Sequence, residues 1–390
     1  MTRTRRLTAA IGAAVLVAAG IGVTTTASAI PTESHCGTEA SGSGIAGFPS
    51  HDQITQTLQR IERSSGGTVD VSVAGLSNQG REIYTARVGT GDTVMLVQSQ
   101  IHGNENHGTP SLLNMLQQLG ANTPWAEEIR DNVTIVAIPR LNVDGGANDT
   151  RQNDYTWDET VANFPQLAGV QPAWNYSNRV GGYDVNRDFN PDLDYVPQPA
   201  DFPGNSADTG WYITPEAQTV RDVYASLEAE FGTVDYFVDL HNQWSCYATD
   251  DLEEMSPLSI SGRFIADPTD FGDWPKFDYD ASRRANVAVY EALQDQGNSG
   301  YGAVTLYPQA INLPGTALGS FALRGSATVL FETSSQTQYD GQKRNGMLRK
   351  QIEVGLTGLI ESIADGSISS IDPATYEEIP NRVFLPPDGV

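Results

Sequence analysis

The chain has 390 residues, of which 39% are hydrophobic and 18% are charged, and its formal net charge is −25. Nucleic acids and anionic membranes are bound by basic faces that neutralise phosphates, so this acidic composition argues against both as partners. Two cysteines in the whole chain exclude a disulfide-stapled scaffold. Frequent aromatic residues and dilute charge argue against disorder, so we expect an acidic, globular, soluble enzyme.

The N-terminus has the pattern of an export signal. Three arginines within the first six residues precede an apolar stretch, and Ala27-Ser28-Ala29 supplies small residues for cleavage. A transmembrane anchor is the alternative, but Gly and Thr interrupt the apolar stretch and no basic stop follows it. We therefore expect a secreted, extracellular protein that is released from the membrane.

Composition divides the chain into four segments. They are a signal peptide (1–29), a flexible leader (30–47), one folded domain (48–366) and a Pro-rich acidic tail (367–390) that is expected to be coil. The leader is too short for a folded pro-domain. Cys36 and Cys246 either pair outside the cell or are unrelated thiols, and the sequence leaves both open.

Apolar runs alternate with helical patterns along the domain. Runs rich in β-branched and aromatic residues predict strands over 94–97, 133–138, 234–240 and 327–331. Helical spacing or capping residues predict helices over 54–61, 109–120, 214–231, 279–296 and 341–363, with Thr109-Pro110 and Thr214-Pro215 as starts. This alternation predicts an α/β three-layer sandwich, a central mixed and mostly parallel twisted β-sheet flanked by helices on both faces.

Three of the predicted strands run directly into polar residues. His102-Gly103-Asn104-Glu105 follows the first, His241 follows the third and Glu332 ends the fourth. Ligands of open α/β sheets bind beyond the carboxyl ends of the strands, so these side chains are expected in one crevice. Two His and one Glu are a common ligand set for catalytic zinc. The sequence therefore predicts one Zn²⁺ per chain, bound by His102, Glu105 and His241.

Each of these residues, taken alone, has a plainer interpretation as a buried polar group with its hydrogen bonds satisfied. His107 is the main competitor as a ligand, and we expect it to be a pocket-rim or structural residue. Glu332 lies outside the ligand set and suits a general base that activates a zinc-bound water. Its alternative is a Glu at a surface edge.

The stretch 140–190 is polar, long and expected to be irregular. It contains Arg151 and Arg187 in a protein with few basic residues. A guanidinium binds carboxylates through two parallel hydrogen bonds, so one arginine is expected to hold a terminal carboxylate and the other a developing oxyanion. Ordinary loop ion pairs are the alternative.

With these residues assembled, the chain resembles the zinc carboxypeptidase family that includes pancreatic carboxypeptidases A and B. The resemblance covers about residues 48–364 and rests on motifs in the family's order: Gly80-Arg81, His102-Gly103-Asn104-Glu105, Asn142-Val143-Asp144-Gly145, Asp184-Val185-Asn186-Arg187, Asp239-Leu240-His241, Tyr307 and Glu332. The resemblance implies a role for each of several residues. Arg81 would lie in the substrate cleft, Arg151 would stabilise the oxyanion, and Asn186 and Arg187 would bind the terminal carboxylate. Asp184 would support His102 from behind, Tyr307 would close over the substrate, and Glu332 would act as the general base.

Some positions depart from the family. Val143 replaces the usual Pro and Asp188 stands where Asn is common. The segment 188–210 is long and acidic, and it is either a solvated loop or a Ca²⁺ site through Asp188, Asp192 and Asp194. The stretch 315–319 falls near the family's side-chain pocket and is small and neutral, which predicts a preference for apolar or small C-terminal residues.

The resemblance implies that 48–366 is the catalytic domain of a zinc metallocarboxypeptidase acting on peptides or proteins with a free C-terminal carboxylate. The export signal predicts that the enzyme is secreted, and we expect a monomer. A peptidase of cell-wall stem peptides or an amide deacylase on the same scaffold is the alternative enzyme. A non-catalytic peptide-binding module is the alternative from another class, although such a module would need neither Glu332 nor a full ligand set.

Overall fold

A computed structural model describes residues 45–383, apart from 245, 250–253, 273, 275, 298–299, 310 and 335–340. The proposed signal peptide and most of the leader lie outside the described residues. Cys246 is buried and is not a free thiol. Cys36, which by the sequence is either paired with Cys246 or unrelated to it, lies outside the described residues.

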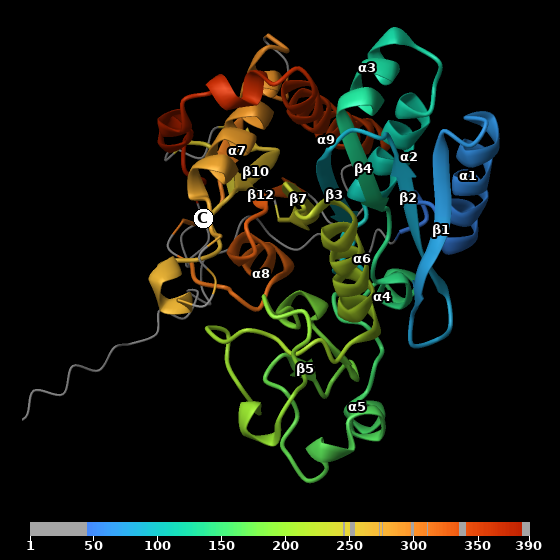
Figure 1. Cartoon of the computed structure of the whole chain (residues 1–390), viewed down its shortest axis with the longest axis vertical. Helices are drawn as coiled ribbons and strands as arrows, with labels where there is room; N and C mark the ends of the chain where they lie inside the picture. Colours follow the sequence, from blue (N-terminus) through green and yellow to red (C-terminus); the bar gives the residue numbers. More distant parts are fainter. Residues whose placement is uncertain are drawn as a thin grey trace, which may run out of the picture. The chain divides into compact units, whose positions relative to one another are not determined.

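An eight-stranded sheet forms the centre of the described residues, in the order β1-β2-β4-β3-β7-β12-β10-β11 (Figure 1). Its strands are β1 (Val69–Leu76), β2 (Glu82–Val88), β3 (Thr93–Ser99), β4 (Val133–Ile138), β7 (Tyr236–Gln243), β10 (Leu258–Ser261), β11 (Val304–Leu306) and β12 (Ala327–Ser334). β3 runs parallel to β4 and β7, β7 to β12, and β10 to β11, whereas the other neighbours are antiparallel. The mixed, mostly parallel sheet is therefore confirmed. Two short pairs lie outside it, β5 (Tyr176–Ser177) with β6 (Gly182–Tyr183) and β8 (Cys246–Tyr247) with β9 (Met255–Ser256).

Helices cover both faces of this sheet. They are α1 (His51–Ser64), α2 (Gly108–Leu119), α3 (Pro124–Asn132), α4 (Val143–Asn148), α5 (Trp157–Asn163), α6 (Pro215–Phe231), α7 (Tyr279–Gln294), α8 (Ala317–Leu323) and α9 (Gly341–Ala364). Figure 1 shows α2, α3, α7 and α9 gathered on one side and α6 and α8 on the other. Among the described residues, no helix has the length and apolar character needed to cross a membrane.

Successive side chains of the central strands pack alternately into two separate hydrophobic clusters. In β3, Met95 and Val97 join the cluster that contains α1, α2, α3, α7 and α9. Val94 and Leu96 point the other way, into the cluster that contains α6 and α8. Strands buried on both faces read as continuous apolar runs, which is why the sequence revealed β3, β4, β7 and β12.

Two expectations about local structure were wrong. α2 begins at Gly108 rather than after Thr109, and its N-cap residue, His107, makes no side-chain cap bond. The Thr109 hydroxyl instead lies 2.7 Å from the Pro139 carbonyl oxygen, inside the protein. The stretch 140–190 is also less irregular than expected, since it contains α4, α5 and the β5–β6 pair.

The tail differs from the coil expected for it. Its described part forms two 3₁₀ helices, Ser367–Ser370 and Pro373–Glu378. Tyr376 and Ile379 are buried in the same cluster as α7 and α9. Burial of an aromatic and a β-branched side chain fixes this segment against the domain.

Candidate metal centre

The candidate ligands lie at one edge of the sheet because three neighbouring strands are parallel. β3, β7 and β12 are adjacent, and their carboxyl ends meet at the same edge. The register places Glu332 of β12 directly beside His241 of β7. The crevice expected from the sequence is therefore formed by these strand ends.

The turn that follows β3 directs His102 and Glu105 toward a common point. Gln100 begins the turn in the left-handed region (φ 58°), and its side-chain amide donates to the Gly103 carbonyl at 2.6 Å. Gly103 packs so closely on Gly145 that an added Cβ would lie 2.1 Å from the Gly145 carbonyl carbon. Only glycine fits this position, and the close approach holds the turn in place.

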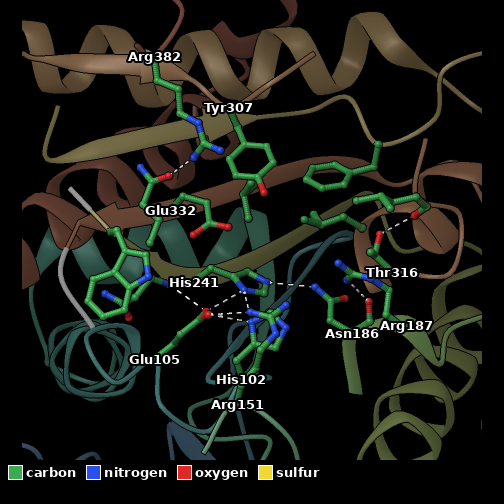
Figure 2. A pocket seen from close by; sticks show the side chains of 17 residues that line it. His102, Glu105, Arg151, Asn186, Arg187, His241, Tyr307, Thr316, Glu332 and Arg382 are labelled. Carbon is green, nitrogen blue, oxygen red and sulfur yellow. Dashed lines mark hydrogen bonds and ion pairs between the residues drawn. The ribbon is translucent and has the colours of Figure 1, made fainter. Parts of the chain in front are cut away.

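His102, Glu105 and His241 form a compact cluster (Figure 2). His102 Nδ1 lies 2.9 Å from Glu105 Oε1, and His241 Nδ1 lies 2.9 Å from Glu105 Oε2. The two Nδ1 atoms are 3.1 Å apart. Ligand atoms of a tetrahedral zinc site, at about 2.0–2.2 Å from the metal, lie about 3.3–3.6 Å from one another, so a small outward movement of the three side chains would admit the ion. Among the described residues this is the one cluster of three or more His, Cys, Asp or Glu side chains that fits a metal ion.

Carboxylates behind the two imidazoles decide which nitrogen faces the cluster. His102 Nε2 lies 3.1 Å from Asp184 Oδ1, and His241 Nε2 lies 2.9 Å from Asp239 Oδ2. A carboxylate accepts, so the hydrogen bond to Asp184 places the proton of His102 on Nε2 and leaves Nδ1 the lone pair that a metal requires. The negative charge of Asp239 favours a proton on Nε2 of His241 in the same way. Asp184 was predicted from the resemblance. Asp239 was not, although residues i and i+2 of a strand share a face, so a role behind His241 was accessible from the sequence.

The cluster requires a positive charge at its centre. In this protonation state two imidazole nitrogens and a carboxylate face one another as acceptors, which is unfavourable without a cation or extra protons. Burial on its own lowers the pKa of His241, but Asp239 and Glu105 raise it well above its usual value. Burial likewise raises the pKa of Glu105, yet His102 and His241 hold it below its usual value. These residues therefore fit a divalent cation with mixed N and O ligands, and zinc is the ion that such a set commonly binds.

Glu332 faces the same cavity, whose volume is about 270 Å³. Burial raises the pKa of its carboxyl, His241 opposes this shift and Glu105 adds to it, and together these effects bring the pKa to about 7. Its Oε2 has no hydrogen-bond partner among the described residues. A carboxyl that is buried, basic for its type and unsatisfied at one oxygen is suited to exchange a proton with a molecule in the cavity.

Arg151, Arg187 and Asn186 line this cavity as well (Figure 2). Arg151 Nη2 lies 3.0 Å from Asp184 Oδ2, and Arg151 Nη1 lies 3.4 Å from Glu105 Oε1. Arg187 donates from Nη1 to the Asn186 carbonyl oxygen at 2.7 Å. Asn186 Oδ1 accepts from the Ala317 N–H at 3.0 Å, so the start of α8 fixes this end of the cavity.

Apolar and small side chains form the wall beside Asn186 and Arg187. Thr316 and Leu318 flank Ala317, and Leu313 and Leu330 complete this part of the lining. The stretch 315–319, singled out in the sequence, thus contributes to the cavity.

Tyr307 lines the cavity, and burial raises the pKa of its hydroxyl. The guanidinium of Arg382 lies over its ring, 4.1 Å from the centroid. Sequence reasoning missed Arg382, Gln243 and Trp244, which also line the cavity. No local pattern marks Arg382, because its position depends on how the tail packs.

Three other candidates lie elsewhere. Arg81 is not part of the cavity lining; it pairs with buried Asp144. His107 is buried between Asn242 and Asn345, and desolvation lowers the pKa of its imidazole to about 4, which agrees with a structural role. Asp188 is also structural, since its carboxylate accepts from the backbone N–H groups of 211, 213 and 214. Asp192 and Asp194 are exposed, and among the described residues they form no metal cluster with Asp188.

Replacement of His241 by alanine is expected to abolish metal binding, because two ligands do not retain zinc against dilution. Elemental analysis of the dialysed protein should find about one zinc per chain in the unchanged protein and little in His241→Ala. His51→Ala, on α1, is the matched control and should retain the metal. A full equivalent of zinc in dialysed His241→Ala would remove His241 from the ligand set.

Comparisons with known proteins agree with this geometry. A family model described as zinc carboxypeptidase matches residues 54–307. The structure is similar to bovine thrombin-activatable fibrinolysis inhibitor in complex with tick carboxypeptidase inhibitor, with a TM-score of 0.55 and 14% identity over 82% of this chain and 98% of that chain. It is also similar to carboxypeptidase A from Helicoverpa armigera, with a TM-score of 0.53 and 16% identity over 81% of this chain and 74% of that chain. At these identities the likeness shows the fold.

Sequence similarity to curated proteins is confined to a short stretch. Over 49 residues the chain is 41% identical to probable carboxypeptidase 2 of Trichophyton verrucosum, which is 13% of this chain and 10% of that protein. The figures for carboxypeptidase 2 of Trichophyton rubrum are the same, except that 9% of that protein is covered. The match thus spans about a tenth of these relatives. Since the family model covers more than half of the chain and the His102, Glu105 and His241 cluster fits the family's metal site, this chain belongs to the zinc carboxypeptidase family.

Proposed function

We propose that this protein is a secreted, zinc-dependent carboxypeptidase that hydrolyses the C-terminal peptide bond of peptides and proteins. One observation carries the proposal. The buried cluster of His102, Glu105 and His241 shares a cavity with Glu332 and with the side chains of Asn186 and Arg187, whose donors suit a carboxylate.

The cavity residues divide the chemistry among them. Zinc held by His102, Glu105 and His241 would polarise the scissile carbonyl and make water more acidic. Glu332 accepts the proton of the attacking water on a carboxylate oxygen and passes it to the leaving amine nitrogen. A pKa of about 7 makes this carboxylate a stronger base than an exposed Glu, while much of it stays ionised at neutral pH.

Positive side chains orient the substrate. Arg187 and Asn186 bind the terminal carboxylate, and a guanidinium does so through two charge-assisted hydrogen bonds. Arg151, beside Glu105, donates to the carbonyl oxygen as negative charge develops on it. Fixing the terminal carboxylate places the last peptide bond at the metal, which is what distinguishes release of a C-terminal residue from cleavage within a chain.

The neutral wall formed by Leu313, Thr316 and Leu318 supports a preference for apolar or small C-terminal residues. A basic side chain would lose hydration there without gaining a carboxylate from this wall. The N-terminal export pattern supports secretion. Asn186 and Arg187 would bind a free carboxylate, and this supports peptides and proteins, which end in one, as substrates.

Glu332→Gln is expected to lower kcat by about 10²–10⁴-fold because the proton acceptor is lost. Zinc content and the affinity for a peptide should stay near those of the unchanged protein, as measured by elemental analysis and equilibrium binding. Glu128→Gln, exposed on α3, is the matched control. A rate within a few-fold of normal in Glu332→Gln would show that another group takes the proton.

Arg187→Ala is expected to raise KM for a blocked dipeptide by about 10-fold or more, since a charge-assisted contact to the terminal carboxylate is lost. Steady-state kinetics on the variant and on Arg179→Ala, an exposed control, measure the effect. An unchanged KM in Arg187→Ala would mean that the carboxylate is held elsewhere.

A blocked dipeptide ending in Phe should be hydrolysed at least about 100-fold faster than its C-terminal amide, because only the free acid engages Arg187 and Asn186. A chelator should abolish the reaction and added zinc restore it. Equal rates for acid and amide would favour an endo-acting amidase on the same scaffold over a carboxypeptidase.

A further inference from the structure

The C-terminal segment places the positively charged side chain of Arg382 in the cavity. After buried Tyr376, residues 380–383 run along the edge of β11, where the Leu306 N–H donates to the Pro380 carbonyl at 2.7 Å. The Arg382 N–H donates back to the Leu306 carbonyl at 3.2 Å, and the Val383 N–H donates to the Tyr247 carbonyl at 2.8 Å. Backbone pairing on both sides fixes where the Arg382 side chain begins.

The Arg382 guanidinium is also fixed. It lies over the Tyr307 ring and donates from Nη1 to Gln243 Oε1. Arg382 lines the same cavity as Glu332 and the metal cluster. Burial lowers the pKa of this guanidinium, yet an arginine stays protonated at neutral pH. The result is a partly desolvated positive charge held in one orientation.

The position of Arg382 relative to the other cavity residues indicates which part of a bound peptide it would contact. Figure 2 shows Arg382 on the far side of Glu332 from the metal cluster, whereas Asn186 and Arg187 lie beside the cluster at the other end. A peptide whose terminal carboxylate meets Arg187 and whose last carbonyl meets the metal must extend its preceding residues away from Arg187. An extended chain advances about 3.3–3.6 Å per residue, so these residues pass along the part of the cavity that Arg382 lines.

We propose that Arg382 binds a carboxylate on the amino side of the scissile bond, so that the protein prefers peptides with an acidic residue shortly before the one it releases. This inference rests on the proposed carboxypeptidase function and adds a second, charged point of recognition to it. A guanidinium offers a planar pair of donors to a side-chain carboxylate. The uncharged amide of Gln has almost the same shape and lacks the charge.

The test uses blocked tripeptides ending in Phe that carry Glu or Gln at the middle or the first position. The unchanged protein should hydrolyse the better Glu peptide about 10-fold faster in kcat/KM than its Gln counterpart, as expected for one charge-assisted contact. Arg382→Gln should reduce this ratio to about one through loss of the Glu peptide's advantage. Arg382→Lys, which keeps the charge, should retain part of the ratio.

Binding provides a readout that does not depend on turnover. Calorimetric titration of the same peptides into Glu332→Gln should show the Glu preference, and titration into Glu332→Gln/Arg382→Gln should not. Arg60→Gln, exposed on α1, removes an equal charge far from the cavity and should leave the ratio unchanged. Thermal denaturation of each variant confirms that it is folded.

The outcomes separate this inference from the function on which it rests. If all the peptides are hydrolysed with equal rates for Glu and Gln, the role of Arg382 is overturned and the carboxypeptidase function is not. A Glu preference that persists in Arg382→Gln would also overturn this role. So would an equal loss of kcat/KM for Glu and Gln peptides in Arg382→Gln, because Arg382 would then only support Tyr307. Failure of the zinc-loaded protein to hydrolyse any of them would instead contradict the carboxypeptidase function.

Discussion

The site depends on an electrostatic constraint. Two imidazole nitrogens and a carboxylate are buried within hydrogen-bond distance of one another, and Asp184 and Asp239 fix the imidazoles so that their acceptor nitrogens face inward. Such a set is stable only around positive charge. The fold supplies the burial and the carboxylates behind the imidazoles, and a divalent cation supplies the charge.

The arrangement of the sheet explains why these residues meet although 139 positions separate His102 from His241 and 91 separate His241 from Glu332. Parallel β3, β7 and β12 end at the same edge, and the register sets Glu332 beside His241. The same register desolvates Glu332, which raises the pKa of its carboxyl to about 7. Stability and chemistry therefore oppose each other here, since an apolar residue in place of Glu332 would be easier to bury.

The sequence predicted strands well where both faces of the strand are buried. β3, β4, β7 and β12 are apolar runs, and the polar residues at their ends were found by that contrast. β1 and β2 were missed because their side chains are partly exposed, so their apolar residues alternate with polar ones instead of forming runs. Thr109 has the local pattern of an N-cap, but its hydroxyl is used by contacts from distant residues. Local patterns do not contain such contacts.

The same distinction applies to the site. His102 and Glu105 follow β3, and His241 and Glu332 lie near the ends of β7 and β12, so all four could be predicted. Arg382 instead enters the cavity from a segment that was expected to be coil. Its position depends on Tyr376 being buried and on pairing with β11, which are tertiary effects.

The most direct test of the central claim is X-ray diffraction from zinc-loaded crystals, recorded on both sides of the zinc absorption edge. The account predicts one strong anomalous peak per chain, within about 2.0–2.2 Å of His102 Nδ1, His241 Nδ1 and a carboxylate oxygen of Glu105. A peak bound by other residues, or no peak among these three side chains, would contradict it.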